Sequence, residues 1–299
     1  MSGAQSSRGR PVDAAALQRM RRRLAAAPEA PWLHAEVARR MAERLPVIRL
    51  QPAVVLDWWA RAGGSGAALA AAYPASSRVR VEAEAAPAAV APWWSPRRWG
   101  RDTAAVLAEA TVPAGAGQLL WANMTLHGVP DPQAQMAAWH RALAVDGFLM
   151  FSTLGPGSLQ GLRDVYRAQG WPPPHAAFVD MHDLGDMLLH AGFADPVMDQ
   201  ELLVLTWADA PSLLRELRSL GGNADPARPA GLRTPRWQGR LLEALGALAG
   251  ADGRLRLEFE IVYGHAFRPP PRPRVQAQTR VAVEDLRAMA RRPRGVPGP

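Results

Sequence analysis

The sequence lacks two reactive residue types, since its 299 residues include no cysteine and no lysine. Without cysteine the chain can form neither a disulfide nor a thiolate metal site, and it has no cysteine nucleophile. No apolar run approaches the roughly 18 residues that a membrane-spanning helix needs. Residues 1–31 contain arginines but no uncharged core of a secretory signal. We therefore expect a cytoplasmic protein that does not insert into a membrane.

The positive charge lies at the two ends of the chain. Residues 1–23 hold six arginines and one acid, and residues 268–299 hold eight arginines and two acids, so of the net +8 the body between them carries −3. A body of that sign offers no general field for a phosphate backbone, which disfavours a nucleic-acid partner and an RNA methyltransferase. The composition of the ends predicts disordered segments at 1–31 and 268–299 around a folded domain at 32–267, with "LQRMRRRLAA" at 17–26 as a candidate short helix.

Helical and strand patterns alternate along this domain. Asp180 stands in N-cap position before an apolar helical stripe, and Gly192 stands at its end. Such alternation predicts an α/β fold with a mostly parallel sheet. The expected helices are residues 30–48, 66–73, 131–147, 158–170, 180–193 and 210–222, and the expected strands are residues 50–59, 78–84, 117–126, 148–155, 196–207 and 253–267.

Four stretches carry a family resemblance. "LLWANMTLHGVPDPQAQMAAWHRALAVDGFLMFSTLGPGSL" resembles the central block of class I S-adenosylmethionine-dependent methyltransferases. Together with "FVDMHDLGDMLLHAGFADPVMD", "LLRELRSLGGNA" and "FEIVYGHAF", it resembles the malonyl-[acyl-carrier protein] O-methyltransferases of biotin synthesis. The resemblance is close from about Gln118 to Phe267, moderate from Trp32 to Asp57, and poor over residues 58–117.

The resemblance implies a Rossmann-like class I methyltransferase fold, with a mostly parallel seven-stranded sheet. A small helical cap is implied at about residues 158–180 and 207–250. The implied activity is a carboxyl O-methyltransferase of biotin (pimeloyl) biosynthesis, with S-adenosyl-L-methionine as cofactor and an acyl-carrier protein bearing a malonyl thioester as partner. A sulfonium methyl is already activated, and a malonyl carboxylate is ionised near pH 7. Alignment and exclusion of water therefore suffice, and we expect no catalytic base and no metal.

The resemblance also implies where the cofactor binds. Family members carry Asp-Leu-Gly-Cys-Gly-Thr-Gly after the first strand, where glycines permit a tight turn and close approach of the cofactor. Here Asp57 stands in place, and Gly64, Ser65 and Gly66 match the last three positions. Ala62 replaces the first glycine, and residues 58–61 hold an insertion of three residues that includes Trp59.

Three further positions complete the expected cofactor site. Glu82 or Glu84, after the second strand, would accept the ribose hydroxyls, since an acid is expected about 20 residues after the turn. Glu109 loosely matches the family's acid near the adenine. Asn123 follows the fourth strand at the edge where ligands collect, although a loop-capping amide is an equal alternative.

Two departures leave a second hypothesis open. The glycine turn is altered, and the family's Tyr-Asp pair before the first helix is replaced by Pro28 and Glu29, or by Trp32. The alternative is therefore a catalytically impaired paralogue that acts as a carrier-protein or partner-binding module. A metal cluster could be suggested by Asp180, His182, Asp183, Asp186 and His190. A structural role is preferred, because Asp180 is expected to cap a helix, and His182 and Asp186 share a helix face without a clear third ligand.

Overall fold

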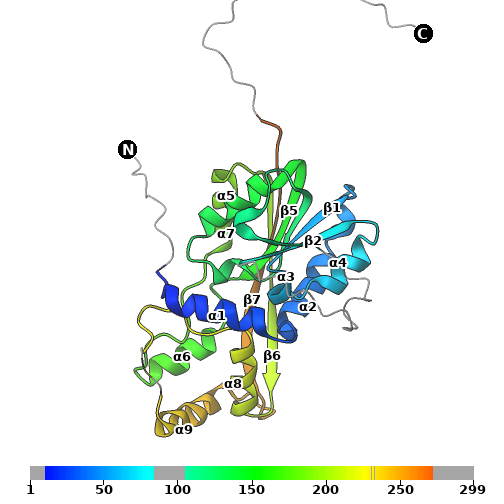
Figure 1. The fold of residues 1–299 in the computed structure, drawn as a ribbon. Coiled ribbons are helices and arrows are strands. Elements are labelled where there is room, and N and C mark those ends of the chain that lie inside the picture. Colours follow the sequence, from blue (N-terminus) through cyan, green and yellow to red (C-terminus); the bar gives the residue numbers. More distant parts are fainter. Residues whose placement is uncertain (1–10, 84–104, 230, 232, 272–299) are drawn as a thin grey trace, which may run out of the picture. The chain divides into compact units, whose positions relative to one another are not determined.

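A computed structural model describes residues 11–83, 105–229, 231 and 233–271. Its strands are β1 Val54–Trp58, β2 Ser77–Glu82, β3 Ala105–Ala108, β4 Gly117–Ala122, β5 Leu143–Leu154, β6 Ala194–Trp207 and β7 Leu255–Phe267. They form one seven-stranded sheet in the order β3-β2-β1-β4-β5-β7-β6 (Figure 1). The pairs β3–β2, β2–β1, β1–β4 and β4–β5 are parallel, and β7 runs antiparallel to β5 and β6. The predicted mostly parallel seven-stranded sheet is confirmed.

The helices cover both faces of this sheet. They are α1 Ala14–Ala26, α2 Trp32–Ala42, α3 Ala60–Gly63, α4 Gly66–Ala72, α5 Pro132–Ala142, α6 Gln160–Ala168, α7 Met181–His190, α8 Ala210–Ser219 and α9 Pro235–Ala244. Because successive strand residues point to opposite faces, Leu56 and Trp58 pack with α5 and α7, whereas Val55 packs with α2 and α4. Helices α6, α8 and α9 gather around the far end of the β6–β7 hairpin, within the segments expected to form the cap (Figure 1).

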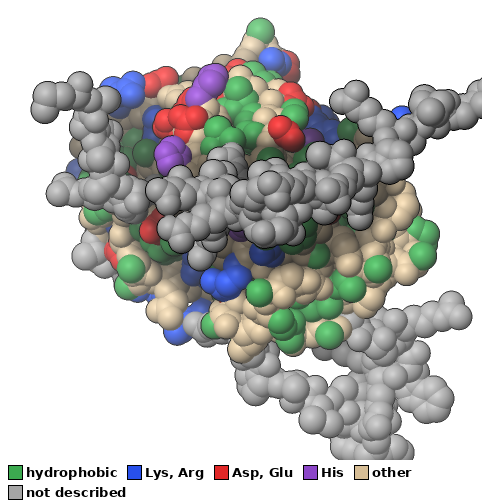
Figure 2. Space-filling view, turned by 90° about the horizontal axis from the view of Figure 1, so that it is seen from above, with side chains coloured by type: hydrophobic (Ala, Val, Ile, Leu, Met, Phe, Trp, Pro, Cys, Tyr) green, Lys and Arg blue, Asp and Glu red, His purple; other side chains and the backbone are tan. Residues whose placement is uncertain are grey.

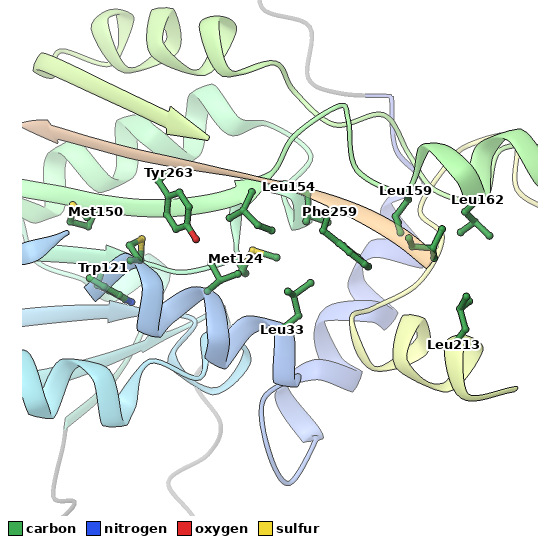
Figure 3. Packing of buried hydrophobic residues seen from close by; sticks show 14 of the residues in the cluster. Leu33, Trp121, Met124, Met150, Leu154, Leu159, Leu162, Leu213, Phe259 and Tyr263 are labelled. Carbon is green, nitrogen blue, oxygen red and sulfur yellow. The ribbon is translucent and has the colours of Figure 1, made fainter. Parts of the chain in front are cut away.

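One hydrophobic cluster joins the sheet to these cap helices. Figure 3 shows Trp121, Met150 and Tyr263 beside the sheet, Leu154 and Phe259 further along it, and Leu159, Leu162 and Leu213 on the side of α6 and α8. All of these side chains are buried. The cap helices therefore share a core with the sheet, and their positions are coupled to it by packing.

Helix α1 corrects the expectation that residues 1–31 are disordered. The Asp13 carboxylate accepts the Ala16 N–H at 2.9 Å and the Arg228 Nε–H at 2.8 Å, and the Asp13 N–H donates to the Ala224 carbonyl at 2.8 Å. Leu17 and Leu24 are buried against the body. The candidate helix at 17–26 is therefore part of a longer, docked helix, which composition did not predict because its apolar stripe is stabilised by a surface contributed by distant residues. Residues 1–10 and 272–299 lie outside the described part of the chain.

A second correction concerns the helix expected to end at Gly147. Helix α5 ends at Ala142, and β5 begins at Leu143, which pairs with Gly117 of β4. A Cβ at position 147 would lie 2.8 Å from the Gln118 carbonyl oxygen. Gly147 therefore allows two neighbouring backbones to approach and does not stop a helix.

Surface charge is mixed on the described body. Figure 2 shows acidic, arginine and apolar side chains interspersed on the face seen from above, as the net charge of −3 over residues 24–267 leads us to expect. In the described part of the chain, no helix has the length and apolar character needed to cross a bilayer.

Candidate functional site

A cavity of about 180 Å³ lies where β1, β2 and β4 end, and we call it the edge cavity. Its floor comes from the residues after these strands, and α1 covers it. Ligands of open parallel sheets bind outside the carboxyl ends of the strands, so this is the expected position for a cofactor. Its lining residues are Gln18, Met20, Arg21, Arg22, Leu24, Ala25, Trp59, Ala62, Glu82, Ala83, Met124, Thr125, His127 and Gly128.

Trp59 gives this cavity its most unusual wall. Its N–H continues the β1–β2 ladder by donating to the Val81 carbonyl at 2.6 Å, after which the chain turns through a left-handed conformation with φ 54°. That conformation costs a non-glycine residue roughly 1–2 kcal/mol. The indole is buried, and the Arg21 guanidinium lies 4.5 Å from its ring while Arg21 Nε donates to the Gly128 carbonyl at 3.1 Å. Residues 60–63, which begin within the inserted stretch 58–61, form α3.

Two buried polar side-chain atoms lie in this wall. Trp59 Nε1 and Thr125 Oγ1 are buried and have no hydrogen-bond partner among the described residues. Such groups are rare in proteins unless a ligand or water pairs with them. Glu82, at the end of β2, accepts the Arg61 N–H at 3.2 Å, and burial raises the pKa of its carboxyl. Of the seven predicted cofactor residues, Glu82 alone lines the edge cavity.

Asn123 is committed to hydrogen bonds within the protein. Its Nδ2 donates to the carbonyls of His34 at 2.7 Å and Gly63 at 2.6 Å, and its Oδ1 accepts the Ser152 hydroxyl at 2.7 Å. Ser65, in the same turn, accepts the Trp121 Nε1–H at 2.7 Å. These bonds join the turn to α2, β4 and β5.

The turn glycines face protein atoms. A Cβ on Gly64, whose φ is +66°, would lie 2.7 Å from the Ala30 Cβ. A Cβ on Gly66 would lie 3.0 Å from the Arg78 guanidinium, which donates to the Gly66 carbonyl at 2.9 Å. The structure thus places Gly64, Ser65, Gly66 and Asn123 around a packed turn, and their contact with a cofactor stays a prediction.

The remaining predicted residues lie on β1 and after β3. Asp57 is buried in β1, opposite Arg80 of β2 in the strand register. Glu109 accepts the Trp58 Nε1–H at 2.6 Å. Glu84 lies outside the described residues.

His34, on α2, is a buried imidazole beside the turn. Its Nδ1 lies 2.7 Å from the Ala62 carbonyl oxygen, which can only accept, so Nδ1 carries the proton and Nε2 is left as an acceptor. Among the described residues Nε2 has no partner. Burial lowers the pKa of His34 to about 4, so the ring is neutral near pH 7.

A second cavity, of about 260 Å³, lies between α1, α6 and α8, and we call it the cap cavity. Leu154, Leu162 and Phe259 make part of its apolar wall. Met20 and His127 line both this cavity and the edge cavity. Ligands bound in the two cavities would therefore lie on either side of Met20 and His127.

Among the described residues, no three or more potential metal-ligating side chains lie close enough together to hold a metal ion. Asp180 forms the N-cap of α7, as its position before the helix predicted. It accepts the His182 N–H at 2.8 Å, and its Oδ1 lies 2.9 Å from the His182 ring Nδ1. The two side chains form a local cap at the surface.

Curated relatives match the chain over most of its length. The malonyl-[acyl-carrier protein] O-methyltransferase of Gallionella capsiferriformans is 38% identical over 248 residues, covering 80% of this chain and 85% of the relative. The protein of the same name from Laribacter hongkongensis is 40% identical over 255 residues, covering 81% and 84%. The chain belongs to the malonyl-[acyl-carrier protein] O-methyltransferase family. No family model matches it.

Solved structures share the Rossmann-like class I fold of this methyltransferase family. The YcgJ protein of Bacillus subtilis superposes with a TM-score of 0.52 at 13% identity, covering 77% of this chain and 98% of that one. The [4+2]-cyclase SpnF superposes with a TM-score of 0.51 at 15% identity, covering 88% and 99%. At these identities the likeness establishes the fold alone.

Several residues of the two cavities were not found from the sequence. His127 and Thr125 follow β4 within the quoted motif "WANMTLHG", so their position after a strand was a usable signal. Met20 and Arg21 carried no such signal, because only the packing of α1 across the strand ends brings them to the cavities.

Proposed function

We propose that this chain transfers a methyl group from S-adenosylmethionine to the free carboxylate of a malonyl group, held as a thioester on an acyl-carrier protein. The observation that carries the proposal is the pair of cavities sharing Met20 and His127 at the end of β4. Methyl transfer needs a donor and an acceptor aligned in contact, and the two cavities adjoin at Met20 and His127, where displacement of these side chains would bring the two ligands together. Membership of the family supports the choice of reaction and substrate.

The edge cavity fits an adenosyl cofactor in its chemistry. The Glu82 carboxylate would accept hydrogen bonds from the ribose hydroxyls, as acids after the second strand do in dinucleotide folds. Thr125 Oγ1 and Trp59 Nε1 are buried groups of the cavity lining that have no partner among the described residues and are available to the cofactor. The cofactor supplies an activated methyl group on a positive sulfur.

Entry of the cofactor requires α1 to move. Ligand clefts usually measure about 300–1,000 Å³, whereas the edge cavity measures about 180 Å³ under α1. Arg61 Nη1 donates to the Ala25 carbonyl at 3.3 Å, and Arg21 contacts Gly128 and Trp59. Helix α1 is also held by the Asp13–Arg228 ion pair and by buried Leu17 and Leu24, so opening has to break these contacts, and closing again would exclude water from the site.

The acceptor needs no general base, because the malonyl carboxylate is ionised near pH 7. The residues of the chain position it and keep water away. The apolar wall of the cap cavity holds the acyl group, and Met20 and His127 mark where its carboxylate would approach the edge cavity. Proximity and desolvation then account for the rate.

A transfer assay tests the proposal. The full chain is incubated with methyl-labelled S-adenosylmethionine and malonyl-carrier protein, and the methyl ester is detected by mass spectrometry. We expect product from the thioester and far less from free malonate. Equal rates on the two acceptors would contradict the carrier-bound substrate.

Cofactor binding is measured separately by calorimetric titration with S-adenosylhomocysteine. Glu82→Gln should weaken binding about tenfold, or about 1.4 kcal/mol. Glu43→Gln is the matched control, because Glu43 is exposed and lies outside the cavity lining, so its replacement should leave the affinity unchanged. Binding without transfer would favour the non-catalytic partner-binding module, and no binding at millimolar cofactor would refute the proposal.

A further inference from the structure

The cap cavity has a charge pattern that the proposed reaction does not use. Its described lining contains Arg23 and Arg218 but no aspartate or glutamate. Within the described part of the chain, neither arginine forms an ion pair with a carboxylate. Both are exposed at the surface, whereas Leu154, Leu162 and Phe259 of the wall are buried. The cavity is therefore apolar inside and cationic at its mouth.

The two arginines meet at one turn of the chain. Arg218 lies in the last turn of α8, and its carbonyl accepts the Gly221 N–H at 3.4 Å. A Cβ on Gly222 would lie 3.3 Å from Arg23 Nη2, and one on Gly221 would lie 2.7 Å from Met20 Sδ. The glycine pair thus lets α1 approach closely, which brings Arg23 of α1 to the same mouth as Arg218 of α8.

The position of the reacting carboxylate is set by the other end of the cavity. Methyl transfer has to occur where the two cavities share Met20 and His127. When the carboxylate of a thioester lies there, the rest of the molecule must extend out through the mouth, because the carrier protein stays outside. The arm that joins an acyl group to a carrier protein is a long uncharged chain that ends in a phosphate. Arginine is the side chain best suited to bind phosphate, through its planar fork of N–H donors.

We propose that Arg23 and Arg218 bind the phosphate of the phosphopantetheine arm at the mouth of the cap cavity, with the uncharged arm along its apolar wall. This inference rests on the proposed function for the identity of the acyl carrier. It adds a phosphate subsite, formed jointly by α1 and α8, that requires α1 to be docked. Recognition of the arm and closure over the cofactor are then made by the same helix.

A crossed comparison of enzymes and substrates tests the subsite. The variant Arg23→Ala/Arg218→Ala is compared with wild type on malonyl-phosphopantetheine and on malonyl-pantetheine, which lacks the phosphate. We expect the KM for the phosphorylated substrate to rise about tenfold at unchanged kcat, and the KM for the phosphate-free substrate to match wild type. The matched control is Arg19→Ala/Arg215→Ala, which removes an exposed arginine from each of the same helices outside the cavity.

Three results would overturn the inference. An equal rise in KM for both substrates would show that the arginines contact the acyl group or stabilise the fold. No loss on either substrate would leave them without a part in binding. A loss of the same size in the control variant would make the effect one of general charge.

Direct binding separates this inference from the proposed function. Full-length wild type and the Arg23→Ala/Arg218→Ala variant are each titrated with 4′-phosphopantetheine and with pantetheine in the absence of cofactor. We expect the variant to bind 4′-phosphopantetheine about tenfold more weakly than wild type and to bind pantetheine with the same affinity. If no malonyl thioester is methylated but this difference persists, the proposed reaction is wrong and the phosphate subsite stands. If inorganic phosphate competes as strongly as the arm, the apolar wall contributes nothing and the subsite is refuted.

Discussion

Gly64→Ala tests whether the glycine turn is shaped by packing. At φ +66° an alanine costs roughly 1–2 kcal/mol, because its Cβ crowds the backbone in the left-handed region. The new Cβ would also lie 2.7 Å from the Ala30 Cβ, and such overpacking typically costs about 1–3 kcal/mol. The two effects together predict a loss of about 2–5 kcal/mol from the free energy of unfolding, a large part of the roughly 5–15 kcal/mol of a typical domain.

The two contributions can be separated by a second substitution. Ala30→Gly removes the atom that the new side chain meets but leaves the backbone conformation unchanged. The double variant Ala30→Gly/Gly64→Ala should therefore be more stable than the sum of the single effects by about 1–3 kcal/mol. Gly66→Ala is the control, because its Cβ meets only the end of the Arg78 side chain, 3.0 Å away, and should change stability by less than about 1 kcal/mol.

Urea unfolding followed by circular dichroism measures all four variants. Additive effects of the Ala30 and Gly64 substitutions would show that the two residues do not touch. A Gly64→Ala protein as stable as wild type would refute the left-handed turn itself. If it kept its stability yet lost cofactor affinity, the glycine would serve the cofactor and not the packing.

The other predictions concern His34, Asn123 and Asp13. Burial lowers the pKa of His34 to about 4, so as pH falls from 6.5 to 4 the unfolded chain takes up a proton that the folded chain does not. The free energy of unfolding should therefore fall by about 3 kcal/mol over that window. His34→Gln should remove this part of the pH dependence, as measured by urea titrations at each pH. Asn123→Ala should lower the free energy of unfolding by about 2–4 kcal/mol, because it leaves two buried carbonyls unpaired. Asn123→Asp should lower it further, because a carboxylate cannot donate to these carbonyls. An aspartate variant as stable as wild type would refute the hydrogen-bond network. The pKa of Asp13 is lowered by its hydrogen bonds from the Ala16 N–H and Arg228, so docking of α1 should be lost as pH falls through that lowered pKa. At neutral pH, Asp13→Ala should speed amide hydrogen exchange across residues 14–26 while β4 and β5 stay protected. Uniform exchange rates in wild type and variant would show that Asp13 does not hold the helix.

The order of elements was legible without any structure. Val55, Asp57 and their neighbours form a short apolar run followed by glycines, and Asp180 and Gly192 bracket one helix, so local chemistry predicted β1 and α7 directly. The family motifs between about Gln118 and Phe267 then implied the sheet and its class. These features could be predicted because each depends on residues close together in the chain.

Side-chain partners across the fold could not be predicted in the same way. Asn123 was expected at the cofactor edge, yet its amide bonds the carbonyls of His34 and Gly63, which are 89 and 60 positions away. Gly147 was expected to end a helix, yet it lies against Gln118 of a neighbouring strand. Hydrogen-bond and packing partners of this kind depend on which strands become neighbours, and no local pattern records that.

By itself, the sequence determined the mostly parallel α/β sheet, the family and an acid after the second strand, Glu82 or Glu84, because strand periodicity and local motifs specify them. Only the tertiary structure decided what surrounds Glu82. In it, Asp13 and α1 pack on a surface made by residues more than 200 positions away, such as Arg228, and Trp59 lines the edge cavity. The physical reason is that the apolar face of α1 and the left-handed turn at Trp59 are stable only against partners that the completed sheet and its cap bring together.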